Sequence, residues 1–169
     1  LVVGWALLPP RQRLDGSTLP PMRHGDVKLN GWVMIGKDSR VIVVLAKSEM
    51  GQGVMTALPT LVAEELDVPL STIRLVQAPL DKIYGDTTMM ADGLPFHPED
   101  QSAIHHLGQW LSRKIERELG IQVTGGSSSV KDCWLPMREA GASARARLML
   151  RSEEHTSELQ SQSTISYAV

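Results

Sequence analysis

Residues 49–68, EMGQGVMTALPTLVAEELDV, decide how this chain is expected to fold. A β-rich apolar run at 40–46 leads into the stretch, and two glycines, Gly51 and Gly53, follow it. Beyond the glycines, apolar residues recur at the spacing of one helix face, which predicts an amphipathic helix; they are Val54, Leu58, Leu61, Val62 and Leu66. The stretch therefore predicts a strand that passes through a glycine turn into a helix.

This glycine turn is the first candidate site. Gly51 and Gly53 lose more conformational freedom on folding than other residues, so they indicate a positive φ angle or a close approach of the backbone to another group. Gln52 lies between them and carries both an amide donor and a carbonyl acceptor, which suits a polar ligand rich in oxygen or sulfur. A strand-to-helix turn with a solvated glutamine explains the same residues, because a lone Gly-x-Gly pattern has low specificity.

The surrounding segments predict an α+β fold of short strands and amphipathic helices. Two β-rich runs, at 29–35 and 40–46, flank a Gly-Lys-Asp-Ser sequence with the composition of a hairpin turn. A further strand is expected within 71–79. A helix is expected from Glu99 to Leu119, stopped by glycine, and its apolar stripe consists of Ile104, Leu107, Leu111, Ile115 and Leu119.

A second glycine turn follows a short β run at 121–123 and precedes another helix. The first N–H groups of a helix are unpaired and its dipole is positive at that end, so the turn is suited to hold an anion or a phosphate. Capping of the helix by a serine side chain is the alternative. The candidate residues of this turn are Thr124, Gly125, Gly126, Ser127 and Ser128.

Composition excludes several kinds of site. The net charge of -2 arises from 17 basic and 19 acidic residues without a long run of either sign, so no nucleic-acid or anionic-membrane partner is indicated. The single cysteine, Cys133, excludes a disulfide framework, a CxxC zinc site and an iron–sulfur cluster ligated by this chain alone. His105 and His106 point about 100° apart on a helix, so we expect no metal site.

Taken together, the two turns resemble those of a known family. Residues 48–79, SEMGQGVMTALPTLVAEELDVPLSTIRLVQAP, and residues 123–145, VTGGSSSVKDCWLPMREAGASAR, occur in this order. They resemble the molybdopterin-binding large subunit of the xanthine dehydrogenase and aldehyde oxidase family, in its isoquinoline 1-oxidoreductase beta subunit type. The resemblance extends over nearly all of residues 1–150 and implies an incomplete part of a larger, two-lobed molybdenum-cofactor-binding domain.

The resemblance also implies a site and a reaction. A molybdenum–pterin cofactor, expected as a dinucleotide, would be contacted by Met50, Gly51, Gln52 and Gly53 in the first turn and by Thr124, Gly125, Gly126, Ser127 and Ser128 in the second. Such enzymes hydroxylate an N-heterocycle or an aldehyde with oxygen derived from water, use a glutamate as base, and pass electrons to a small iron–sulfur subunit.

The glutamate motif has no match in this sequence. We therefore expect no catalytic residue in this chain and no activity from it alone. Glu49, Glu64 and Glu65 do not fit the role of the base, because no partner that would tune their pKa is visible in the sequence. A non-catalytic α+β assembly or phosphate-binding module is the alternative function.

The two ends of the sequence carry separate expectations. Residues 1–10, LVVGWALLPP, resemble the end of the apolar region of a twin-arginine-type signal peptide, which implies the periplasm or its membrane face; a buried strand in a cytoplasmic protein is the alternative. Residues 11–28 are expected to be an extended linker, and residues 29–150 the partial cofactor domain.

Residues 151–169 share no apolar periodicity with the rest of the chain. Back-translated, RSEEHTSELQS fits a common short-read sequencing adapter, and ISYAV fits the adapter sequence that follows the index. We therefore expect this tail to be translated library DNA and disordered. A natural disordered tail is the alternative, since the Ser, Glu and Gln content is ordinary for one.

Overall fold

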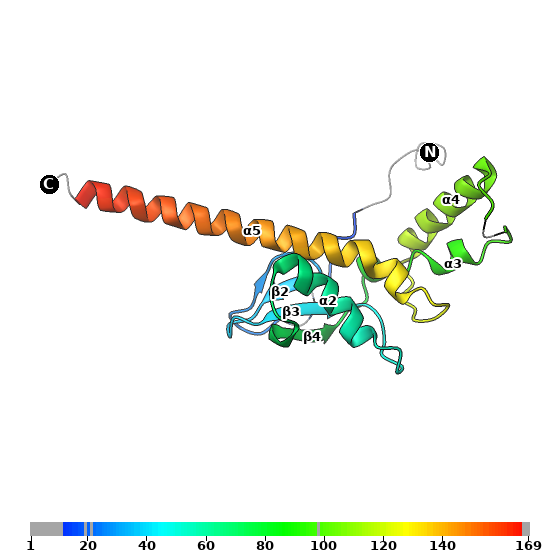
Figure 1. The fold of residues 1–169 in the computed structure, drawn as a ribbon, viewed down its shortest axis with the longest axis horizontal. Helices are drawn as coiled ribbons and strands as arrows, with labels where there is room; N and C mark the ends of the chain where they lie inside the picture. Colours follow the sequence, from blue (N-terminus) through cyan, green and yellow to red (C-terminus); the bar gives the residue numbers. More distant parts are fainter. Residues whose placement is uncertain (1–11, 19, 21, 98, 167–169) are drawn as a thin grey trace.

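The computed structural model describes residues 12–166 apart from 19, 21 and 98, so the expected signal-peptide remnant at 1–10 lies outside the described residues. Figure 1 shows a small sheet covered by helices, with one long helix extending beyond it. The elements in chain order are β1 (Val27–Lys28), β2 (Val33–Ile35), β3 (Val41–Leu45), α2 (Val54–Leu66), η1 (Leu70–Thr72), β4 (Ile73–Gln77), η2 (Lys82–Tyr84), α3 (Met89–Asp92), α4 (Ala103–Leu119) and α5 (Ser129–Ser166).

The sheet confirms the predicted α+β class. Strands β2 and β3 form the expected antiparallel hairpin, with Val33 opposite Val43. Strand β4 lies parallel to β3, with Val41 beside Ile73. Since parallel neighbours need a crossover connection, α2 provides it. The strand order is β1-β2-β3-β4, and β1 lies within the segment expected to be a linker, which therefore joins the sheet instead of leading up to it.

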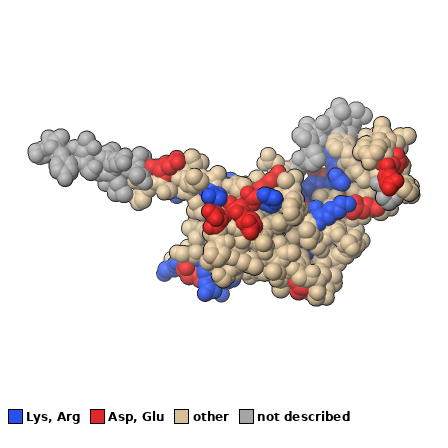
Figure 2. Space-filling view, viewed as in Figure 1, with Lys and Arg blue, Asp and Glu red and all other residues tan. Residues whose placement is uncertain are grey.

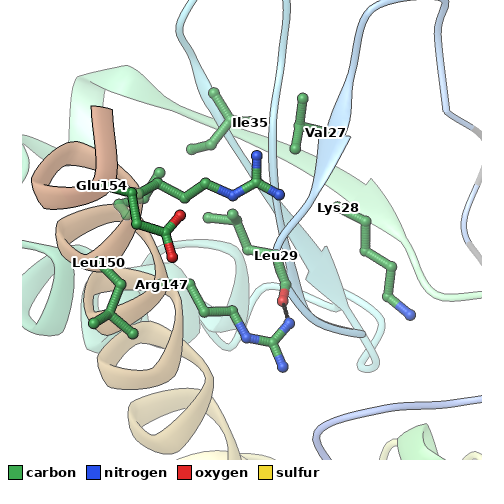
Figure 3. Close-up of a pocket in the computed structure, with 9 residues that line it drawn as sticks. Val27, Lys28, Leu29, Ile35, Arg147, Leu150 and Glu154 are labelled. Carbon is green, nitrogen blue, oxygen red and sulfur yellow. Dashed lines mark hydrogen bonds between the residues drawn. The ribbon is translucent and has the colours of Figure 1, made fainter. Parts of the chain in front are cut away.

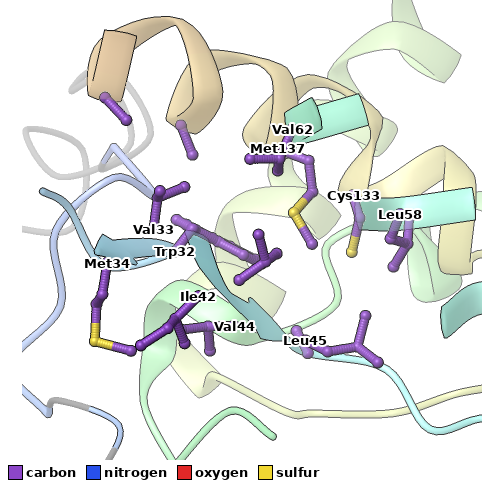
Figure 4. Packing of buried hydrophobic residues seen from close by; sticks show 14 of the residues in the cluster. Trp32, Val33, Met34, Ile42, Val44, Leu45, Leu58, Val62, Cys133 and Met137 are labelled. Atoms are coloured by element: carbon purple, nitrogen blue, oxygen red, sulfur yellow. The ribbon is translucent and has the colours of Figure 1, made fainter. Parts of the chain in front are cut away.

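The hydrophobic core lies between the sheet and the helices α2 and α5. All five residues of β3 are buried, which agrees with its apolar sequence on both faces. Leu58 and Val62 of α2 meet Cys133 and Met137 of α5 over the strands (Figure 4). Each fully buried aliphatic side chain contributes about 1.5–3 kcal/mol by leaving water, so the two helices and the sheet stabilise one another.

Helix α4 begins and ends as helix-capping rules require. The hydroxyl of Ser102 accepts a hydrogen bond from the N–H of His105, and Gly120 closes the helix with a left-handed φ of 64°. The apolar stripe of this helix, however, is not part of the core. Its residues, Ile104, Leu107, Leu111, Ile115 and Leu119, are 39–72% exposed. The buried positions are His105, Lys114, Glu116 and Arg117, because α4 packs on α3 and η2 through its polar side.

Helix α5 continues through Ser166, so the backbone of 151–166 is helical where the sequence predicted disorder. The segment contains no glycine or proline that would end the helix, and its Glu, Leu and Gln residues favour helix formation. Residues 151–155 are exposed. The adapter origin of this segment stays a prediction. Although α5 has 38 residues, no helix in the described part of the chain is long and apolar enough to cross a membrane.

The contact between α2 and α5 depends on a missing side chain at Gly141. A Cβ atom added there would lie 2.7 Å from Glu65 Cβ and 3.2 Å from the carbonyl oxygen of Val62. In α4, by contrast, a Cβ atom at Gly108 would meet Phe96 and Leu94 at 3.4 and 3.5 Å, which is ordinary contact. Gly141 therefore has no space for a methyl group, whereas Gly108 has space for one.

We expect Gly141→Ala to lower the free energy of unfolding by about 1–3 kcal/mol, because overpacking forces two backbones apart. Gly108→Ala should raise it by about 0.5–1 kcal/mol, the usual gain when alanine replaces glycine within a helix. Urea denaturation of both variants measures these changes. A stabilised Gly141→Ala variant would contradict the close packing of α2 on α5.

Candidate functional site

The two predicted glycine turns lie next to each other in the folded chain. The N–H of Ser48 donates a hydrogen bond of 2.9 Å to the hydroxyl oxygen of Thr124, across 76 positions of sequence. The first turn precedes α2 and the second precedes α5, and Figure 1 shows both loops at the same end of the molecule. The tertiary structure therefore assembles one candidate site from two separate motifs.

The first turn has the backbone shape that its glycines indicated. Gly51 and Gly53 have φ angles of 90° and 80°, a region that side chains disfavour. Gln52 folds back onto the turn: its carbonyl oxygen accepts from the N–H of Met50 at 2.5 Å, and its amide nitrogen donates to the carbonyl of Ser48 at 2.7 Å. One lone pair and one hydrogen of the amide stay available for a ligand.

Glu49 is a part of this turn that sequence reasoning missed. One carboxylate oxygen accepts from the N–H groups of Gly51 and Gly53, and the other accepts from the N–H of Met55, each at 2.9 Å. The bonds from Met55 and Gly53 lower the pKa of Glu49 below its ordinary value. A carboxylate placed before a glycine-rich helix start is the sequence signal that could have indicated this arrangement.

The second turn divides into an open part and a buried part. Gly126 and Ser127 have left-handed φ angles of 57° and 55°, so the chain reverses sharply before α5. The hydroxyl oxygen of Ser128 lies 2.6 Å from Asp86 Oδ2 and 2.9 Å from the carbonyl oxygen of Gly125, and these two acceptors share its single hydrogen. Ser128, which was predicted to contact the cofactor, is fully buried and holds the turn against the protein interior. Gly125 faces open space.

A buried cluster of charges underlies both turns. Lys47, which precedes the first turn, is completely buried, and its ammonium nitrogen lies 2.5 Å from Asp86 Oδ2 and 3.3 Å from Asp132 Oδ2. It also donates to the carbonyl of Val123 at 3.1 Å, beside the second turn. The segment 121–123, expected to be a short strand, is not a strand; its carbonyls accept from Lys47 and from the N–H of Asp86 instead.

Arg13 supplies the second cation of this cluster. Its guanidinium donates to both carboxylate oxygens of Asp132, at 3.0 and 3.1 Å, and to the carbonyls of Ile83 and Gly85 at 2.9 Å. Arg13 belongs to segment 11–28, which the sequence predicted to be an extended linker, and its side chain takes part in the buried charge cluster. Two buried carboxylates therefore face two cations, which limits the desolvation cost of each charge.

The carboxylate of Asp86 is held in its ionised form. Burial alone would raise its pKa, but the hydrogen bonds from Lys47 and Ser128, with those from the backbone N–H groups of Thr88 and Met89, lower the pKa below its ordinary value. Asp86 thus accepts a hydrogen bond from Lys47, which precedes the first turn, and one from Ser128 of the second turn. It is the side chain that joins the two turns, and no local motif in the sequence marked it.

Three glycines of the two turns face open space. A Cβ atom added at Gly51, Gly53 or Gly125 would meet no atom within 4 Å. Met50 is 66% exposed. The turns therefore offer glycine backbone and the Gln52 amide, a set of neutral donors and acceptors that fits a polar organic cofactor.

The other residues that the sequence raised as possible metal ligands or reactive groups lie outside the two turns or are unreactive. His105 stacks on Phe96 and contacts the carbonyl of Asp100 at 2.5 Å. No group of three or more His, Cys, Asp or Glu residues in the described ranges could hold a metal ion. Cys133 is buried, and burial together with the Asp132 carboxylate raises the pKa of its thiol to about 12.

A hollow of about 540 Å³ lies between β1, β2 and α5. Val27, Leu29 and Ile35 line one side of it, and Arg147 donates to the carbonyl of Leu29 across it (Figure 3). Its far wall includes Arg151 and Glu154 from the expected adapter segment, and it contains none of the residues of the glycine turns. Figure 2 shows charges of both signs interspersed on the visible face of the molecule. Neither this hollow nor the distribution of surface charge contributes to the candidate site at the glycine turns.

Comparison with known proteins connects the first turn to a cofactor. The family model of the molybdopterin cofactor-binding domain matches residues 4–93, more than half of the chain, which includes the first glycine turn and ends before the second. Isoquinoline 1-oxidoreductase subunit beta of Brevundimonas diminuta is 46% identical over 61 residues, which are 36% of this chain and 8% of that protein.

A second relative is more distant but covers more of the chain. The membrane-bound aldehyde dehydrogenase [pyrroloquinoline-quinone] of Gluconacetobacter polyoxogenes is 27% identical over 118 residues, 70% of this chain and 11% of that protein. Its name contains a quinone, whereas the family model describes a molybdopterin cofactor. The chain spans about a tenth of the length of these two relatives. No solved structure matches it.

We expect Lys47→Met to lower the free energy of unfolding by about 3–5 kcal/mol, because two carboxylates would stay buried without their shared ammonium group. The control is Lys28→Met, which removes a partly exposed ion pair with Asp15 and should change stability by less than about 1 kcal/mol. Urea denaturation with equal m-values measures both. Equal losses in the two variants would contradict the role of Lys47.

Asp86 should make stability depend on acid pH. Because its folded pKa lies below the ordinary value of 3.8, its contribution is present above that value and is lost as pH falls through the folded pKa. We expect the free energy of unfolding to fall more steeply with decreasing pH, below about pH 4, in the wild type than in Asp86→Asn. Parallel pH profiles of the two proteins would argue against the ionised Asp86.

Proposed function

This chain belongs to the molybdopterin cofactor-binding domain family. We propose that its two glycine turns hold part of a molybdenum–pterin cofactor in a longer oxidoreductase subunit. The observation that carries the proposal is the contact between Ser48 and Thr124, which joins the turns. Together with the open space at Gly51, Gly53 and Gly125, it creates a surface on which a polar ligand can approach the glycine backbone closely.

The two turns differ in what they can bind. In the first, the N–H groups of Met50, Gly51, Gly53 and Met55 already donate to the side chains of Glu49 and Gln52. This turn therefore offers the remaining capacity of the Gln52 amide and its own carbonyl groups. The second turn lies at the start of α5, where the helix dipole and the first N–H groups favour an anionic part of the cofactor, such as a phosphate.

When bound, a molybdenum–pterin group supplies the redox chemistry of a hydroxylation that uses oxygen from water. The residues of this chain orient that group, because the buried charges beneath the turns fix the backbone that contacts it. The carboxylates at and beneath the two turns do not have the surroundings of a catalytic base: the carboxylate of Glu49 is engaged by three N–H groups, and Asp86 and Asp132 are buried in ion pairs.

The finer assignments follow from the family and its relatives. We propose an N-heterocycle or an aldehyde as substrate, in line with the names of the two relatives, and a small iron–sulfur subunit as electron acceptor. The catalytic glutamate would lie in a part of the subunit outside this chain, which by itself would be inactive. Export to the periplasm or its membrane face is the location that we propose from residues 1–10.

Replacing Gln52 in the full-length protein tests the cofactor role. Gln52→Ala should lower the pterin and molybdenum content per protein, with about a tenfold loss of affinity for a hydrogen bond to a charged or strongly polar group. Gln101→Ala is the matched control, since Gln101 is exposed just before α4 and belongs to neither glycine turn. Cofactor content that is unchanged in both variants would favour a phosphate-binding or assembly module instead.

A further inference from the structure

We infer that Glu49 is a positioning residue, whose carboxylate fixes the Met-Gly-Gln-Gly turn in the shape that presents Gln52 to the cofactor. This inference rests on the proposed function of the turn. The carboxylate of Glu49 acts on the turn through hydrogen bonds from three of its backbone N–H groups.

The contacts of the carboxylate leave the turn little freedom. Gly51, Gly53 and Met55 each donate an N–H to it at 2.9 Å, from positions two, four and six residues further along the chain. Charge-assisted hydrogen bonds of this kind are stronger than those between neutral groups. Because Gly51 and Gly53 have positive φ angles and can adopt many other conformations, a fixed acceptor is needed to select this one.

The start of α2 has no other cap. Its N-cap residue is Gly53, which has no side chain and makes no side-chain capping bond. In most helices a Ser, Thr, Asp or Asn at this position accepts one of the first N–H groups. Here Glu49 takes that role from four residues upstream, so one carboxylate caps the helix and shapes the turn together.

This arrangement also decides which chemical groups the turn can accept. Backbone N–H groups at a helix start would otherwise form an anion site, but Glu49 occupies three of them with its own negative charge. A phosphate is thereby excluded from the first turn. Gln52, whose carbonyl oxygen accepts from Met50 and whose nitrogen donates to Ser48, is the polar side chain that the shaped turn offers to a ligand.

The test compares Glu49→Gln with Glu64→Gln in the full-length protein. Glu64 lies exposed on α2, so its replacement also removes one carboxylate charge but leaves the turn untouched. The first measurement is the hydrogen-exchange protection of the amides of residues 50–55. We expect Glu49→Gln to lower this protection by about tenfold, since a charge-assisted acceptor is lost, while Glu64→Gln leaves it unchanged.

The pH profile separates shaping of the turn from a general loss of stability. In the wild type, protection of residues 50–55 should fall as pH drops below 4.5, the ordinary pKa of the Glu49 carboxyl, because its folded pKa is lowered. In Glu49→Gln that dependence should disappear. Protection at the end of α2, residues 61–66, should stay the same in both. Unchanged protection or an unchanged pH profile of residues 50–55 in Glu49→Gln overturns the inference.

Cofactor content distinguishes this inference from the proposed function. Glu49→Gln should lower pterin content together with protection, whereas Gln52→Ala should lower pterin content with protection of Gly51 and Gly53 retained. If only Gln52→Ala lowers the content, the positioning role is overturned and the cofactor role stands. If Glu49→Gln lowers protection but neither variant changes the content, the cofactor role is overturned and the shaping of the turn stands.

Discussion

The buried ammonium group of Lys47 is the constraint on which the rest of this structure depends. A cation without contact to water is tolerated only where anions and carbonyl groups surround it. Asp86 reaches it from the loop after η2, Asp132 from the first turn of α5, and Val123 from the loop between the helices. Three segments that are distant in sequence therefore converge on the end of β3. The second cation, Arg13, completes the balance by binding Asp132.

Because these segments converge, buried side chains fix one side of the candidate site, while its glycines lie on the open side. Lys47 is followed directly by the first glycine turn, and Ser128, the last buried residue of the second turn, donates to the same Asp86 that binds Lys47. Each turn is thus anchored by a buried side chain at one end, while the glycines remain on the open side. The close approach of α2 and α5 at Gly141 aligns the two helix starts at this end of the molecule.

Family membership and geometry account for different parts of the function. The family match extends over the first turn, with Gln52 and its two glycines. The geometry adds that the second turn lies beside the first, joined to it by the bond between Ser48 and Thr124, and that Glu49 and Asp86 accept hydrogen bonds from residues of the turns. A binding surface made of backbone depends on such supporting residues, because glycine by itself does not select one conformation.

The sequence by itself determined the local features: the amphipathic face of α2, the two strand-to-helix glycine turns and the hairpin of β2 and β3. Helical spacing, glycine conformation and turn composition are properties of neighbouring residues, so they can be read along the chain. Only the tertiary structure decided which features meet. The stripe of α4 has a strong helical period yet lies on the surface, because periodicity indicates an apolar face and not the partner that covers it. Lys47 and Asp86 are 39 residues apart, and such a charged pair can be recognised only when folding has removed both groups from water.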